Sequence, residues 1–348
     1  MTDSVIGWDL GGAHLKAARL APDGGVAGVV QLACPLWQGL GHLEAAMRGA
    51  IHQLGAAAVN ALTMTGEMVD LFASRDEGVA RILDTAEGLL GGPGLRVYAG
   101  AAGLVPVADA RRRAPQVASA NWMATAAFIA RRLPWAFLVD IGSTTADLIP
   151  IGDGRVRALG ATDFDRLVHD ELVYTGIART PVMAMTPAVT FEGLRVPLVA
   201  EYFATSADVY RLTGELPEGA DLHPAADQGE KTAEASARRL ARMIGRDATS
   251  APLERWRELA HALRDAQLAM LLAAFDRQML RGAVGPEAPL VAAGVGRFLV
   301  EEMARRRDRQ VRAFAELFPP GAASAARIND CAPAVAVAAL GAALGAAA

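Results

Sequence analysis

Two segments of the sequence share one pattern, an apolar run that ends in Asp-x-Gly and continues with small residues. They are Val5–His14 (VIGWDLGGAH) and Phe137–Asp147 (FLVDIGSTTAD). Each predicts a hairpin whose tight turn offers backbone N–H groups to an anion. Either segment alone is also compatible with a hairpin that binds nothing. Because the pattern occurs twice, we expect a cleft that holds a phosphorylated ligand from both sides.

The residue types in these turns suit a metal-bound phosphate. Glycine lets the backbone approach phosphate oxygens, and hydroxyl side chains add hydrogen-bond donors. The expected phosphate ligands are Gly11, Gly12, Gly142, Ser143, Thr144 and Thr145. Carboxylates cannot bind phosphate themselves, so Asp9, Asp140 and Asp147 are predicted to bind a Mg²⁺ ion that neutralises it, because Mg²⁺ prefers one or two carboxylates together with waters.

A third glycine turn follows near the end of the chain. The segment Pro289–Phe298 (PLVAAGVGRF) reads as a buried strand, a glycine turn and the start of a helix. We expect Gly294, Gly296 and Arg297 to lie against a nucleotide-like ring or another phosphate, since a helix N-terminus favours anions. A dinucleotide fingerprint would need a further glycine where Leu299 stands. A purely structural turn is equally compatible with this segment.

Lysine usage singles out two cations. Only Lys16 and Lys231 are lysine among 34 basic residues, which suggests positions that need a compact ammonium group. Lys16 lies two residues after His14 on a predicted strand, so both side chains share one face and are expected to point at a bound diphosphate. Lys231 is expected to bind phosphate, or else to be a solvated surface residue. Arg179 is expected to bind a phosphate or a carboxylate, or to hold loop carbonyl groups.

Acid–base chemistry is expected from Glu67, with His14 and Lys16 as further catalytic candidates. Glu67 follows a predicted buried strand, and its role as general base is implied by the superfamily resemblance given below. Helix capping is the alternative for this residue. Asn121 and Trp122 are candidates for contact with an aromatic ring of the substrate. A helix-start asparagine and a core tryptophan are the alternatives for that pair.

Length and composition agree with a soluble enzyme of two domains that acts on a small-molecule partner. The chain has 348 residues, which is more than one hydrophobic core usually serves. Its net charge of −4 gives no reason to expect nucleic acid or a membrane as a partner. The only cysteines, Cys34 and Cys331, have no metal-binding spacing, so a reduced, cytoplasmic setting is expected. Neither a secretion signal nor a membrane span is expected, and a homo-oligomer is left open.

The hydrophobic patterns predict a mixed α/β order in each half of the chain. In the first half we expect helices at about 41–56 and 76–90 and strands at 4–10, 14–20, 26–33, 59–64 and 95–99. A helix at 121–132 lies near a predicted hinge. The second half begins again with strands at 136–141, 145–151 and 155–160, and ends with a strand at 289–293 and a helix to about residue 306.

The second half also contains an insertion, expected at about 181–285. Residues 181–223 are predicted to form loops and short pieces, followed by helices at about 232–246 and 251–281. This insertion would line the substrate end of a cleft, or merely thicken the scaffold. A last helix at 333–346 is expected to pack back near the hinge. The predicted domains are therefore 1–130, joined by the C-terminal helix 333–348, and 131–332 with the insertion.

In their order along the chain, these motifs resemble those of the acetate and sugar kinase, Hsc70 and actin superfamily. The fold implied is a two-lobed actin-like or ribonuclease H-like α/β fold, with duplicated mixed sheets and helices around a central cleft. Longer motifs are similar to those of a hydantoinase/oxoprolinase-related group within it, the tetrahydromethanopterin-linked one-carbon transfer pathway proteins. These motifs are 174–182 (YTGIARTPV), 200–216 (AEYFATSADVYRLTGEL) and 231–247 (KTAEASARRLARMIGRD).

The closer resemblance implies a transferase of methanofuran or methylofuran biosynthesis. Archaeal members of the group join a furan-methyl diphosphate to the phenol oxygen of a tyramine-type acceptor and release pyrophosphate. The implied partners are thus a small-molecule diphosphate and a phenolic acceptor, with Mg²⁺ as cofactor. Charge stabilisation would fall to Lys16, and removal of the phenol proton to Glu67 or His14. The superfamily as a whole implies two alternatives, an ATP-dependent kinase that binds ATP or ADP, and a nucleotide-binding regulator without catalysis.

Overall fold

The computed structural model describes residues 4–345, which divide into two compact units. The first unit contains the chain up to Leu138, the segment Ile149–Val168 and the chain from Arg312 onward. The second contains Val139–Leu148 and His169–Val311. Strands and helices are mixed along residues 4–345 in both units, which confirms the predicted α/β class. The domain boundary near residue 130 and the extent of the insertion stay predictions.

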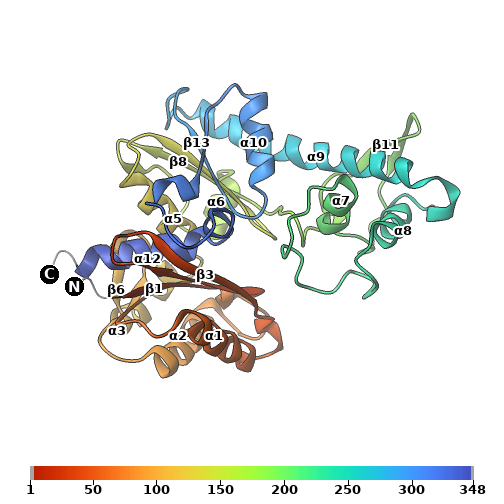
Figure 1. Ribbon diagram of the computed structural model, residues 1–348. Helices are drawn as coiled ribbons and strands as arrows, with labels where there is room; N and C mark the ends of the chain where they lie inside the picture. Colours follow the sequence, from red (N-terminus) through yellow and green to blue (C-terminus); the bar gives the residue numbers. More distant parts are fainter. Residues whose placement is uncertain (1–3, 346–348) are drawn as a thin grey trace. The chain divides into compact units, whose positions relative to one another are not determined.

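A six-stranded sheet in the order β3-β2-β1-β4-β5-β6 forms the centre of the first unit (Figure 1). Its strands are β1 (Val5–Leu10), β2 (His14–Leu20), β3 (Val26–Ala33), β4 (Val59–Met64), β5 (Leu95–Tyr98) and β6 (Leu104–Pro106). β1 pairs antiparallel with β2 across a short turn and parallel with β4 across a helical connection. The strands predicted in the first half of the chain are confirmed.

Helices cover both faces of this sheet (Figure 1). α1 (Leu40–Leu54) and α2 (Arg75–Leu90) bury Met47 and Ile82 in one core with Trp8 of β1. The C-terminal helix α12 (Ala332–Gly345) packs on the alternate residues of β1. A Cβ atom on Gly7 would lie 2.0 Å from the carbonyl oxygen of Ala334, so this close contact between helix and sheet requires glycine.

Shorter elements complete the first unit. They are α3 (Val107–Arg111), α4 (Ala114–Val117), α5 (Asn121–Ala130), β9 (Arg155–Val156), α6 (Asp163–Val168) and α11 (Ala325–Asp330). The strand predicted at 155–160 is wrong beyond Val156. There the chain bends so that Gly160 approaches the backbone of α6, where a Cβ atom would lie 2.5 Å from the Arg166 nitrogen.

A second sheet has the order β10-β8-β7-β13-β14, and β9 pairs with β8. Its longer strands are β7 (Ala136–Ile141) and β8 (Ala146–Gly152), and the others are β10 (Leu172–Val173), β13 (Leu290–Ala293) and β14 (Val311–Ala313). α10 (Arg297–Arg306) follows β13 directly. The strands predicted at 136–141, 145–151 and 289–293, and the helix to about residue 306, are confirmed.

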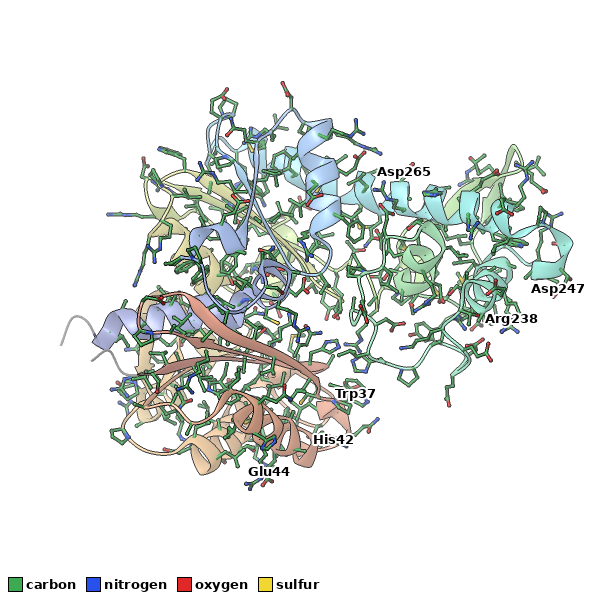
Figure 2. All side chains as sticks on the ribbon, in the orientation of Figure 1. Trp37, His42, Glu44, Arg238, Asp247 and Asp265 are labelled. Atoms are coloured by element: carbon green, nitrogen blue, oxygen red, sulfur yellow. The ribbon has the colours of Figure 1, made fainter. Side chains whose placement is uncertain are left out.

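The segment between β10 and β13 is more regular than its prolines and loops predicted. It forms the hairpin of β11 (Ala188–Phe191) and β12 (Leu194–Pro197), followed by the helices α7 (Ser206–Thr213), α8 (Ala233–Met243) and α9 (Leu253–Leu280). The hairpin packs on α9 through Phe191, whose ring stacks 5.3 Å from that of Trp256. Figure 2 shows Arg238 of α8 and Asp265 of α9 at the surface of this segment. Within residues 4–345, none of the helices combines the length and apolar character of a membrane span.

Candidate functional site

The first Asp-x-Gly segment forms the predicted hairpin. The Gly11 N–H donates to the His14 carbonyl oxygen at 3.1 Å, which closes a turn of Gly12 and Ala13. A Cβ atom on Gly11 would lie 2.6 Å from that same oxygen, and one on Gly12 would lie 2.6 Å from Cγ1 of Val69. Both glycines are therefore required by the packing of the turn itself. Their contact with phosphate stays a prediction.

Asp9, His14 and Lys16 lie on one face of the first sheet beside this turn. Asp9 of β1 is directly opposite Lys16 of β2, and cross-strand partners point to the same face. His14 shares that face because it lies two residues before Lys16. Asp9 is only 4% exposed, whereas Lys16 is partly exposed. Both charges act on the nearby Cys331 thiol, whose pKa is raised to about 12 by burial.

The second Asp-x-Gly segment closes in the same way with different chemistry. The Gly142 N–H donates to the Thr145 carbonyl oxygen at 2.8 Å across a turn of Ser143 and Thr144. Continuing this antiparallel pairing by two residues on each side places Asp140 of β7 opposite Asp147 of β8. The first hairpin thus carries an aspartate opposite a lysine, and the second carries two aspartates. Paired carboxylates are the arrangement that suits Mg²⁺.

The motif YTGIART wraps around the second turn. The Arg179 N–H donates to the Ser143 carbonyl oxygen at 2.8 Å, and the Ile177 N–H donates to that of Gly142 at 3.1 Å. A Cβ atom on Gly176 would lie 2.4 Å from the Thr144 nitrogen. Only glycine permits this approach, so the motif fixes the shape of the turn. The structure therefore brings the backbone of Arg179 to the turn that the sequence had predicted to bind phosphate.

A buried side-chain network supports the YTGIART motif from α9. Gln267 donates from Nε2 to Thr175 Oγ1 at 2.8 Å and to the Gly176 carbonyl oxygen at 2.9 Å. Its Oε1 accepts from the Tyr210 hydroxyl at 2.5 Å. Burial raises the pKa of Tyr210, which keeps this hydroxyl a donor. Gln267 was not among the predicted site residues because no local sequence pattern connects it to Thr175.

The third glycine turn lies against the end of β7. The Gly296 N–H donates to the Ile141 carbonyl oxygen at 2.8 Å. Gly294 has a φ of +81°, and a Cβ atom there would lie 2.4 Å from Oδ1 of Asp140. Arg297 is the first residue of α10. The structure thus places Gly294, Gly296 and Arg297 next to Asp140, while their contact with a ring stays a prediction.

Glu67 belongs to a buried cluster in the first unit. It lies in the 3-10 turn Gly66–Met68 after β4 and is 1% exposed. Its Oε1 lies 2.7 Å from Oγ of Ser119, which lies 3.3 Å from Oδ2 of Asp163. Arg75 donates from Nη2 to that Oδ2 at 2.7 Å. Ser119 and Asp163 were not predicted as site residues, because 44 residues separate them in the sequence.

Burial is the main influence on the charge of Glu67. It raises the pKa of this carboxyl group above the ordinary value, and the charge of Asp163 acts in the same direction. A hydrogen bond donated to the carboxylate by the Ser119 hydroxyl group or by the Glu67 backbone N–H would oppose the shift, as does the charge of Arg75. A buried carboxyl group with a raised pKa is a common feature of sites that transfer protons.

The remaining predicted residues have structural partners. Trp122 is 2% exposed, and the Arg166 guanidinium lies 4.2 Å from its ring centroid. Asn121 accepts from the Trp122 backbone N–H at 2.7 Å at the start of α5. Lys231 donates from Nζ to the Asp221 carbonyl oxygen at 2.8 Å. These contacts agree with the structural alternatives for all three, and their ligand contacts stay predictions.

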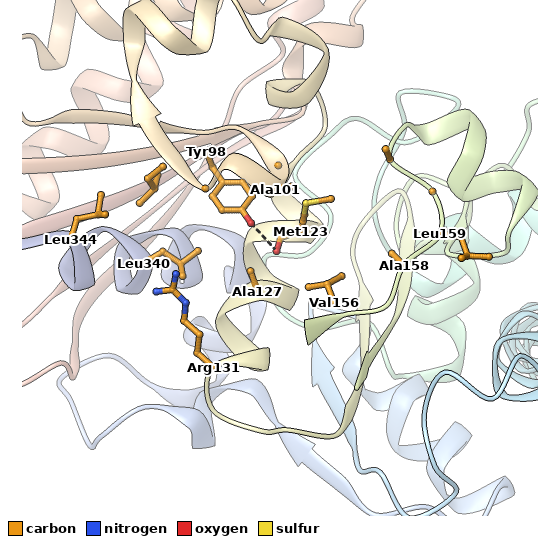
Figure 3. Close-up of a pocket in the computed structure, with 15 residues that line it drawn as sticks. Tyr98, Ala101, Met123, Ala127, Arg131, Val156, Ala158, Leu159, Leu340 and Leu344 are labelled. Atoms are coloured by element: carbon orange, nitrogen blue, oxygen red, sulfur yellow. Dashed lines mark hydrogen bonds between the residues drawn. The ribbon is translucent and has the colours of Figure 1, made fainter. Parts of the chain in front are cut away.

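A separate cavity of about 420 Å³ lies in the first unit (Figure 3). Its walls include Met123 and Leu340, with Arg131 as a cation among apolar side chains. The Tyr98 hydroxyl donates to the Met123 carbonyl oxygen at 3.4 Å. None of the predicted site residues is among those that line it.

The two carboxylates of the second hairpin fit a Mg²⁺ ion whose other ligands are substrate phosphates and waters. Among residues 4–345, no group of three His, Cys, Asp or Glu side chains could hold a metal ion. Mg²⁺ commonly binds through one or two carboxylates, with substrate phosphates and waters as the other ligands. Asp140 and Asp147 suit that mode of binding better than a metal site made only of protein ligands.

The sheet order, the two hairpins and the late glycine turn define an actin-like α/β protein. A nucleotide-free structure of acetone carboxylase matches this fold with a TM-score of 0.50, at 11% identity over 84% of this chain and 65% of that chain. The hydantoinase/oxoprolinase family matches residues 58–328. The protein belongs to this family, and the predicted resemblance is confirmed.

Two archaeal relatives carry the same name, (4-{4-[2-(gamma-L-glutamylamino)ethyl]phenoxymethyl}furan-2-yl)methanamine synthase. The protein of Methanocaldococcus jannaschii is 32% identical over 244 residues, which are 70% of this chain and 72% of the relative. That of Methanococcus vannielii is 40% identical over 81 residues, which are 23% of this chain and 36% of the relative.

Proposed function

We propose that the protein is a biosynthetic synthase that forms an aryl ether in methanofuran or methylofuran biosynthesis. It joins a furan-methyl diphosphate to the phenol oxygen of a tyramine- or tyrosine-type acceptor and releases pyrophosphate. The name of the Methanocaldococcus jannaschii relative describes a phenoxymethylfuran, and the match covers 72% of that relative. The second hairpin carries the proposal, because its paired aspartates and hydroxyl-lined turn suit a metal-bound diphosphate.

The diphosphate end of the reaction is assigned to the hairpin turns. Asp140 and Asp147 would hold a Mg²⁺ ion, and this ion would neutralise the charge of the leaving diphosphate. The Ser143 and Thr144 hydroxyl groups supply donors to the phosphate oxygens.

The bond changes require one base. The C–O bond to the diphosphate breaks with its electron pair, and the electron-rich furan stabilises the positive charge on the methylene carbon. The phenol oxygen attacks that carbon and then loses its proton. We assign this acid–base step to the cluster of Glu67, Ser119 and Asp163, with His14 as the alternative. Burial raises the pKa of the Glu67 carboxyl group in this cluster, a feature common in sites that transfer protons.

The test uses purified protein, Mg²⁺, a furfuryl diphosphate and a panel of phenols, with aryl ether detected by mass. We expect Asp140→Asn and Asp9→Asn to abolish Mg²⁺-dependent release of pyrophosphate while circular dichroism stays unchanged. The matched control is Asp153→Asn, an exposed residue with a φ of +52° that asparagine also adopts. Normal turnover in either site variant, or formation of ADP from ATP in place of an ether, would overturn the assignment.

A further inference from the structure

The Ser119 hydroxyl group lies between two carboxyl groups. It is 2.7 Å from Glu67 Oε1 and 3.3 Å from Asp163 Oδ2. A serine hydroxyl has one hydrogen, so it can donate to only one of them. If both carboxyl groups were ionised, Ser119 could donate to one of them, and its oxygen would face the other without a hydrogen between the two oxygen atoms. The geometry is satisfied on both sides only if one carboxyl group carries a proton and donates to Ser119.

The charges around the cluster identify the carboxyl group that is protonated. Asp163 is ion-paired with Arg75 at 2.7 Å, lies 3.7 Å from Arg166 and is 14% exposed. Glu67 is 1% exposed, and none of the described residues donates to its Oε2. A buried carboxylate oxygen without a donor is costly, whereas the carbonyl oxygen of a neutral acid costs less. The charged groups that face Glu67 are Arg75 of α2 and Asp163 of α6.

The backbone of Ser119 also points to a specific role. Its φ is +51°, a left-handed conformation that is uncommon for residues other than glycine and costs energy. Residues 114–117 and 121–130 on either side of it are helical. The left-handed residue between these helices directs the hydroxyl group toward both carboxyl groups. Strain of this kind is often retained at functional positions.

Exposed apolar side chains occur beside the cluster, at Met68 in space and at Phe164 in sequence. Phe164, the next residue in α6, is 74% exposed, and Met68 is 47% exposed. The Met68 sulfur lies 4.0 Å from Ser119 Oγ, so its side chain adjoins the cluster. Thioether and aromatic side chains both pack well against aromatic rings. Arg75 Nη2 lies 2.8 Å from the Met68 sulfur and 2.7 Å from Asp163 Oδ2, so a phenol that packs on Met68 would place its hydroxyl group near Asp163, the more exposed of the two carboxyl groups.

We propose that Asp163 accepts the phenol proton and that Glu67 is a neutral positioning residue that acts through Ser119. Glu67 donates from its protonated Oε1 to Ser119, and Ser119 donates to the ionised Asp163. As the new C–O bond forms, the electron pair of the phenolic O–H bond stays on the ether oxygen and the proton moves to Asp163. Asp163 then releases the proton to water. The identity of the proton donor rests on the proposed function, whereas the direction of the hydrogen bonds does not.

Glu67→Gln is the decisive variant, because the glutamine amide donates to Ser119 as a neutral carboxyl group does. We expect its kcat for ether formation to stay within about threefold of the wild type, whereas a general base at Glu67 predicts a loss of about 100-fold or more. Asp163→Asn should lose about 100-fold or more. The matched control is Asp76→Asn, which removes an exposed carboxyl group from α2 and should leave kcat unchanged.

Infrared spectroscopy tests the hydrogen-bond direction without any turnover. The wild type should show a carboxylic acid C=O band at neutral pH that is absent from Glu67→Gln. Ser119→Gly removes the hydroxyl group and suits the positive φ, so the fold should be kept. If Ser119 accepts from neutral Glu67, the midpoint at which this band disappears with rising pH should move down in Ser119→Gly. If Ser119 instead donates to an ionised Glu67, the midpoint should move up.

The possible failures can be told apart. Absence of the acid band, an upward midpoint in Ser119→Gly, or inactivity of Glu67→Gln would each overturn the role assigned to Glu67. If the wild type forms no ether with any phenol, the proposed function fails and the proton acceptor fails with it. The infrared result would still decide the direction of the hydrogen bonds in that case.

Discussion

Replacing Glu67 with glutamine should change how the stability of the protein depends on pH. The pKa of the Glu67 carboxyl group is raised above 4.5 in the folded protein, mainly by burial. The folded state therefore binds a proton more tightly than the unfolded state does. This contribution to stability is fully present below the unfolded pKa and is lost as the pH rises toward the folded pKa. Glutamine does not titrate, so the free energy of unfolding of the variant does not fall with rising pH for this reason.

The size of the effect follows from proton linkage. A shift of one pKa unit corresponds to about 1.4 kcal/mol, so the free energy of unfolding can fall by at most about that amount for each pH unit. Between the ordinary pKa of 4.5 and neutral pH, the wild type should therefore lose at most about 3 kcal/mol relative to Glu67→Gln. The loss should level off once the pH exceeds the folded pKa.

Urea denaturation followed by tryptophan fluorescence measures this difference at a series of pH values. The quantity of interest is the free energy of unfolding of the wild type minus that of Glu67→Gln, since other titrating groups cancel. Glu258→Gln, in which an exposed carboxyl group on α9 is removed, controls for the change in net charge. A difference that is constant from about pH 4.5 to about pH 7, or that grows, would refute the account of Glu67 as a buried neutral acid.

Three further substitutions probe the supports of the site. Gly176→Ala should weaken binding of pyrophosphate with Mg²⁺ by about tenfold or more in calorimetry, because its Cβ atom meets the backbone of Ser143 at 2.5 Å and displaces the second turn. Gln267→Ala should lower the free energy of unfolding by about 1 to 3 kcal/mol in urea denaturation, because it leaves the buried Thr175 hydroxyl group without this partner. Gly7→Ala should lower it by about 1 to 3 kcal/mol in the same assay, because the methyl group overpacks the contact with α12. Wild-type values in any of the three would contradict the contact concerned.

Local patterns were sufficient for most of the strands and for both hairpins. Apolar runs and Asp-x-Gly turns encode these elements within about ten residues, so the closing bonds at Gly11 and Gly142 were predictable. The short helix α7 was missed because prolines surround it. Thr205 and Asp208 form a capping box at its start and Gly214 ends it with a φ of +78°, and these signals would have located it.

The contacts that complete the candidate site were beyond the reach of local patterns. Gln267 is 92 residues from Thr175, and Asp163 is 88 residues from Arg75. Such pairs form because of packing between distant segments, which composition and periodicity do not encode. Glu67 was identified from its position after a strand, yet its proton-sharing partner Ser119 became visible only in three dimensions. The ligand contacts of the turn residues stay predictions.

The contact between Gly7 and Ala334 has a consequence for synthesis on the ribosome. α12 covers one face of β1 and is synthesised more than 300 residues after it. At typical translation rates, the strand waits roughly tens of seconds for its helix. During that interval the sheet presents an unprotected apolar face, so the nascent chain is a natural client for a holding chaperone, and productive folding of this unit is expected to begin only after α12 has left the exit tunnel.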